Sequence, residues 1–238
     1  MRQFRQLMQT ALAAGAIAGT ILFVYQYLVV VPRIVAAEAY ESRGEIVETG
    51  AGGHQHAEWQ PNEGLERNFF TAAGTILTGV AYASLLLSTV ALCGFELDLR
   101  RGLLWGLAGF VCFAMAPALG LPPVPPGVPE SDVGARQLWW VMTAGATAAG
   151  LFLIFAARRG WLPRIAGGLL LLLPHAIGAP QATGPEVVPA HLVRSFALAS
   201  IAGNGLFWLV LGAAAGFLSR GADGQVTGSI IPSDPASR

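Results

Sequence analysis

The chain has 238 residues, of which 54% are hydrophobic and 12% are charged, with a mean hydropathy of +0.56 and a formal net charge of zero. A soluble domain carries about 25% charged residues, so this composition excludes a soluble globular protein and indicates an integral membrane protein. All 14 basic residues are arginine and they form no cluster, so nucleic-acid binding is not expected.

Six apolar runs predict an all-α integral membrane protein with about six transmembrane helices. The runs cover residues 11–31, 69–92, 103–121, 138–157, 165–179 and 191–218. The run over residues 165–179 is the shortest, and a re-entrant path for it would reduce the count to five. We expect residues 1–218 to form one transmembrane domain and residues 219–238 to form a polar, disordered tail.

The first run follows two arginines, as a secretory signal would. Its apolar part is about 20 residues long, whereas the apolar core of a signal has about 7–15, so a retained anchor helix is predicted. Gly15 and Gly19 have GxxxG spacing, and Gly212 and Gly216 repeat it in the last run. This spacing indicates close helix packing.

The distribution of arginines predicts the orientation in the membrane. Nine arginines lie on the side of the N-terminus and five on the opposite side, so both termini are expected to be cytoplasmic. The outer face then holds all four histidines and ten of the 14 acidic residues. Its excess of negative charge would concentrate cations by its field alone.

The longest polar segment, residues 32–67, is expected to be an acidic outer loop with one helical turn around Glu38 and Glu41. The i, i+3 spacing places these two carboxylates on one helix face. There they either guide a hydrated cation or are simply solvated.

Three potential metal ligands, His54, His56 and Glu58, alternate within this loop. In an extended conformation the three side chains point the same way, so they could share one cation. The alternative is a solvated loop without a fixed geometry. A third strong ligand would have to come from His175 or His191.

His175 lies within Pro174-His175-Ala176-Ile177-Gly178-Ala179-Pro180. Pro174 removes a backbone hydrogen bond, and Gly178 and Pro180 oppose a restart, so a helix is expected to end here and present the imidazole. Neutral imidazole suits divalent cobalt, nickel, zinc and copper. Alternatively, this histidine bonds a backbone carbonyl that the break has freed.

An internal similarity suggests a duplication. Residues 100–122 align without gaps on residues 158–180, with nine identities in 23 positions, and similar residues open the two preceding runs. We interpret the pattern as a duplicated hairpin, in which the second and third runs match the fourth and fifth as a parallel repeat.

Motifs for catalysis are absent from the sequence. There is no nucleophile paired with a base, no phosphate-binding loop and no HExxH motif, so neither an enzyme nor a permanently bound cofactor is expected. Cys93 and Cys112 lack CxxC spacing, which argues against a disulfide or a thiolate metal site.

Six stretches over nearly the full length carry a family resemblance. They are Phe4-Arg5-Gln6-Leu7, Ala37-Glu38-Ala39-Tyr40-Glu41, Arg67-Asn68, Arg136-Gln137-Leu138-Trp139-Trp140, Leu173-Pro174-His175-Ala176-Ile177-Gly178-Ala179-Pro180 and Val188-Pro189-Ala190-His191-Leu192. In these residues the chain resembles CbtA, a family of cobalt transporter subunits.

The resemblance implies a multi-pass protein of the bacterial inner membrane that imports Co²⁺ for cobalamin synthesis, with five spans in the usual family description. It also implies a small single-span partner, CbtB, that carries a histidine motif. Membrane lipid and a further copy of the chain are the other expected partners.

Our first hypothesis is therefore a subunit that passes Co²⁺ inward. In it the acidic loop gathers the ion, and His54, His56 and His175 take part in coordination. The second hypothesis is a non-transporting scaffold or assembly subunit with structural histidines. Transport of nickel or another divalent metal, and a channel for another small solute, are also open.

Overall fold

The computed structural model describes residues 2–48, 64–155, 160–185 and 187–227, which form helices and loops without a strand. In chain order the helical elements are α1 (Arg2–Tyr25), the π-helical turn η1 (Gln26–Val30), α2 (Val31–Glu48), α3 (Leu65–Leu92), α4 (Leu99–Phe110), the π-helical turn η2 (Val111–Met115), α5 (Ala116–Gly120), α6 (Val133–Phe155), α7 (Leu162–Ile177) and α8 (Ala190–Thr227). The all-α prediction is confirmed.

Five helical stretches in the described part of the chain are long and apolar enough to cross a membrane. They are Phe4–Tyr40, Leu65–Leu92, Leu99–Gly120, Val133–Phe155 and Ala190–Ser219. The predicted run over residues 165–179 corresponds to α7. Its 16 residues reach about 24 Å at ~1.5 Å per residue, less than the ~30 Å of a hydrocarbon core. In this part of the chain, the number of transmembrane helices is five without α7 and six with it.

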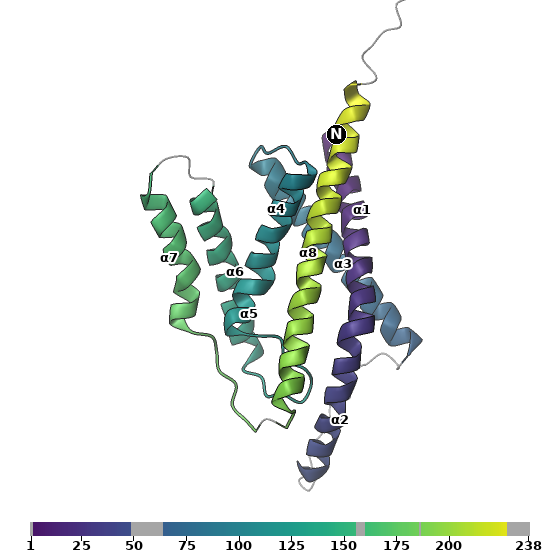
Figure 1. Ribbon diagram of the computed structural model, residues 1–238, viewed down its shortest axis with the longest axis vertical. Helices are drawn as coiled ribbons and strands as arrows, with labels where there is room; N and C mark the ends of the chain where they lie inside the picture. The colour runs from purple at the N-terminus through teal and green to yellow at the C-terminus, as the bar shows by residue number, and fades with distance from the viewer. Residues whose placement is uncertain (1, 49–63, 156–159, 186, 228–238) are drawn as a thin grey trace, which may run out of the picture.

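Figure 1 shows how α7 is placed. It runs antiparallel to α6, and the chain then continues in the same direction toward the start of α8, so it does not return to the end where α7 began. The N-terminus of α1 and the C-terminal part of α8 consequently lie at the same end of the bundle. We call the opposite end, where α2 ends at Glu48 and α8 begins at Ala190, the far end.

The first helix continues further than the sequence indicated. A loop was expected from residue 32, but α2 carries the helix past Pro32 to Glu48. The turn η1 precedes the proline, and the Val31 N–H donates to the Gln26 carbonyl five residues back. Pro32 has no N–H to donate, and the wider π-helical turn lets the helix continue past it. The alanines and glutamates that follow favour helix, which sustains it beyond the proline.

The last helix is also longer than predicted. The tail expected from residue 219 is helical as far as Thr227, because extending an existing helix requires no new nucleation. Residues 228–238 lie outside the described part of the chain.

Glycines set the spacing between paired helices. Gly15 and Gly19 of α1 face Gly79 of α3, and a Cβ on Gly19 would lie 2.7 Å from the Ile76 Cα. In the α6–α7 pair, a Cβ on Gly150 would lie 2.7 Å from the Gly167 carbonyl oxygen. Backbones this close leave no room for a side chain, as the GxxxG spacing predicted.

The α4–α8 pair is built in the same way. Gly102 and Gly106 of α4 meet Gly212 and Gly216 of α8. Next to this contact, Trp208 of α8 is buried and stacks on Phe113, with ring centroids 5.5 Å apart and an interplanar angle of 8°. The structure therefore assigns Trp208 to packing.

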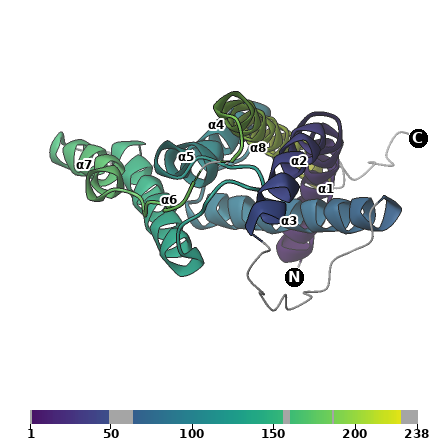
Figure 2. The ribbon, with the colours of Figure 1, turned by 90° about the horizontal axis from the view of Figure 1, so that it is seen from below.

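The two hairpins of the predicted repeat pack differently. Helices α6 and α7 lie side by side, whereas α3 packs on α1 and α4 packs on α8, with little contact between α3 and α4. Figure 2 shows α3 crossing the bundle while the α6–α7 pair stands apart from it. The sequence similarity is thus not accompanied by a shared packing arrangement.

We expect Gly102→Ala to lower the free energy of unfolding by about 1–3 kcal/mol, because a Cβ there would overlap the Gly212 carbonyl and lie 3.1 Å from the Gly216 Cα. Denaturant titration of the purified chain in mixed micelles measures the change. The matched control is Gly145→Ala, whose Cβ would meet no atom within 4 Å. A control that is destabilised as much as Gly102→Ala would contradict this account.

Candidate functional site

The candidate ligands that the structure describes all lie toward the far end of the bundle, on three separate helices. Glu38 belongs to α2, His175 to the last turn of α7 and His191 to the first turn of α8. Glu41 is also in α2, but its side chain is outside the described part. His54, His56 and Glu58 lie wholly outside it. Among the described residues, no three histidine, cysteine or acidic side chains are close enough together to hold a metal ion.

His175 is held by a helix that includes its proline. Pro174 is inside α7, which ends only at Ile177, where the Gly178 N–H donates to the Pro174 carbonyl at 3.0 Å. Gly178 has φ +90°, a left-handed conformation that glycine adopts readily. The predicted break therefore occurs one turn later than Pro174.

The imidazole of His175 packs edge-on against the indole of Trp139 in α6, with ring centroids 5.9 Å apart. Within the described part of the chain, neither ring nitrogen of His175 has a hydrogen-bond partner. The alternative in which this histidine bonds a freed carbonyl is therefore not observed there. A half-buried neutral imidazole that is positioned by a ring contact can offer a ligand whichever ring nitrogen does not carry the proton.

The Trp139-Trp140 pair opens an apolar run, a position typical of an interfacial aromatic anchor, but Trp139 packs inside the bundle. Trp139 is only 3% exposed, and its ring lies against Gly120, where a Cβ would come within 2.6 Å of the indole. Its indole N–H is buried without a partner among the described residues. The glycine at position 120 was the sequence feature that could have indicated room for the Trp139 ring.

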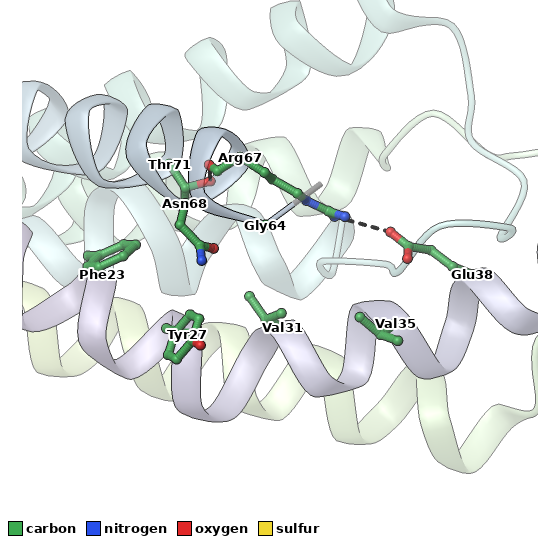
Figure 3. Close-up of a pocket in the computed structure, with 9 residues that line it drawn as sticks. All are labelled: Phe23, Tyr27, Val31, Val35, Glu38, Gly64, Arg67, Asn68 and Thr71. Carbon is green, nitrogen blue, oxygen red and sulfur yellow. Dashed lines mark hydrogen bonds and ion pairs between the residues drawn. The ribbon is translucent and has the colours of Figure 1, made fainter. Parts of the chain in front are cut away.

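A hollow lies between α1–α2 and the start of α3 (Figure 3). Its volume is about 240 Å³. Its lining consists of Phe23, Tyr27, Val31, Val35, Glu38, Gly64, Arg67, Asn68 and Thr71. At its polar end, Arg67 forms an ion pair with Glu38 at 3.1 Å, and the two side chains are 40% and 37% exposed. We call this hollow the α1–α3 pocket.

The charge of the far end is unevenly distributed. Its described acidic side chains, Glu38, Glu66, Glu130 and Asp132, are balanced in number by Arg33, Arg67, Arg136 and Arg194. Glu38 forms an ion pair with Arg67, and Glu130 forms one with Arg136. The acidic excess predicted for this face therefore resides in residues 41–63 and Glu186, whose side chains are not described.

The five long apolar helices in the described part of the chain define a helical, multi-pass membrane protein. Residues 4–220 match the family described as "Probable cobalt transporter subunit (CbtA)". The chain belongs to this family, which confirms the resemblance found in the sequence. A subunit implies at least one partner. No curated protein and no solved structure matches the chain.

We expect the ion pair between Glu38 and Arg67 to contribute about 0.2–1 kcal/mol to folding, since both side chains are partly solvated. A double-mutant cycle with Glu38→Gln and Arg67→Gln, followed by denaturant titration, measures the coupling. Combining Glu38→Gln with Arg136→Gln is the control, and these two changes should be additive. Equal coupling in both cycles would show that the pair has no specific role.

Proposed function

We propose that the chain imports Co²⁺ across the bacterial inner membrane for cobalamin synthesis, together with a small single-span partner that carries a histidine motif. Both termini are cytoplasmic in this proposal, so the far end faces outward. The family match over residues 4–220 is the observation that supports cobalt as the cargo. The half-buried His175 at the far end supports a route for the ion there.

The proposed metal site is shared between segments. A divalent transition-metal ion takes four to six ligands, and no described group provides even three. His54, His56 and Glu58 would therefore bind the ion first and pass it to His175, with His191 as the other imidazole of this end. The partner's histidines would supply the remaining ligands.

The acidic residues have a longer-range role in this proposal. Glu41 and its neighbours in residues 41–63 attract the hydrated cation by their field. Glu38 adds little to this attraction, because Arg67 at 3.1 Å offsets its charge. Imidazole and carboxylate ligands bind Ni²⁺ at least as strongly as Co²⁺, so selectivity has to come from geometry or from metal supply.

Uptake of ⁵⁷Co²⁺ by cells that lack other cobalt importers tests the role of the histidines. We expect His175→Ala and the double change of His54 and His56 to alanine each to reduce uptake at least tenfold at unchanged expression. Gln181→Ala is the control, because its side chain donates only to the Ala179 carbonyl nearby and is expected to leave uptake unchanged. Full uptake by His175→Ala would show that His175 is structural and would overturn its proposed role in the route of the ion.

The partner can be tested in the same cells. We expect ⁵⁷Co²⁺ uptake when the chain is expressed with the single-span partner and markedly less when either is expressed alone, because the described ligands are too few for a complete site. Quantitative immunoblotting of membranes controls for expression. No uptake from the pair, with both proteins present in the membrane, would move the assignment to an assembly subunit.

A further inference from the structure

The α1–α3 pocket lies where two helices leave the hydrocarbon region. No charged residue occurs in α1 and η1 between Arg5 and Arg33, and none occurs in α3 after Arg67. Arg67 and its partner Glu38 are therefore at the polar boundary of the membrane, where lipid headgroups lie. The rest of the pocket extends from that boundary into the apolar region.

One wall of the pocket is a row of apolar side chains whose length matches the thickness of one lipid leaflet. Phe23, Tyr27, Val31 and Val35 are spaced four residues apart and line the same side of the helix. From Phe23 to Glu38 the helix rises about 22 Å, and half of a bilayer with its headgroups is about 20 Å thick. Tyr27 and Val35 are 50% and 54% exposed, so this row is open to an apolar neighbour.

The polar end of the pocket carries one charge of each sign. The Arg67 guanidinium and the Glu38 carboxylate are 3.1 Å apart, and the Asn68 amide points into the pocket toward Tyr27, further along the helix (Figure 3). Neither that amide nor the Tyr27 hydroxyl has a side-chain hydrogen-bond partner within the described residues. These groups offer donors for a phosphate and an acceptor for an ammonium group.

We propose that the α1–α3 pocket binds a zwitterionic phospholipid with a primary ammonium group, of the phosphatidylethanolamine class. Arg67 binds its phosphate, Glu38 accepts from its ammonium group, Asn68 donates to the glycerol ester region deeper in the pocket, and an acyl chain lies along the apolar row. A free divalent cation would be repelled by Arg67, and an anionic headgroup would be repelled by Glu38. The pair of opposite charges fits a headgroup that has the same pair. This site does not depend on the proposed metal transport.

Native mass spectrometry of the full-length chain tests the site, with phosphatidylethanolamine and phosphatidylglycerol supplied at equal mole fractions. We expect the wild-type chain to retain one phosphatidylethanolamine in preference to phosphatidylglycerol. Arg67→Gln should weaken this retention roughly tenfold, because it removes a charge-assisted hydrogen bond to the phosphate. Glu38→Gln should keep a bound lipid and lose the preference between the two headgroups.

Arg136→Gln is the matched control, because it breaks another arginine–glutamate ion pair at the far end and lies outside the pocket. Its lipid retention should equal that of the wild-type chain. If Arg67→Gln does not fold, Val35→Trp provides an independent test, since the larger side chain fills the groove and should exclude the lipid. Three results would overturn the proposal: no preference in the wild-type chain, equal loss in Arg136→Gln, or cross-linking of a photoreactive residue at position 35 to another protein helix.

Discussion

Close contact between helix backbones at glycine is the interaction on which this bundle depends. Within lipid, apolar side chains gain little by leaving their surroundings, so helices associate through tight packing. Each of the three pairs, α1–α3, α4–α8 and α6–α7, has glycines where the helices approach most closely. The aromatic cluster around Trp208 then fills the space beside one of these contacts.

The position of these contacts also explains the α1–α3 pocket. Gly15 and Gly19 contact α3 in the middle of α1, and the two helices diverge from there toward Glu38 and Arg67. The α1–α3 pocket occupies the space that the divergence leaves, and the ion pair bridges its mouth. The same geometry separates the candidate metal ligands onto different helices, so the described helices alone do not assemble a metal site.

Local patterns in the sequence predicted the helices, the close packing at Gly15, Gly19, Gly212 and Gly216, and the shared end of His175 and His191. They could not predict which helices would pair, since any two glycine-bearing faces satisfy the spacing. The two hairpins of the predicted duplication also pack differently from each other. Pro32 was overestimated as a helix breaker, because it follows a π-turn. The helix that contains Pro174 ends at Ile177, within the predicted stretch and one turn after the proline. Trp139 was misjudged because burial in a helix interface and exposure at a membrane surface give the same aromatic signal.

The extension of α2 beyond Pro32 has a consequence for the shape of the far end. The helix places Glu48 about 24 Å beyond the proline, whereas α3 begins at Leu65, close to Arg67. Glu48 comes ten residues after Glu38, so α2 continues about 15 Å past the ion pair that joins Glu38 to Arg67. The last turns of α2 therefore project beyond the start of α3 as a helical arm, which Figure 1 shows at the far end of the bundle.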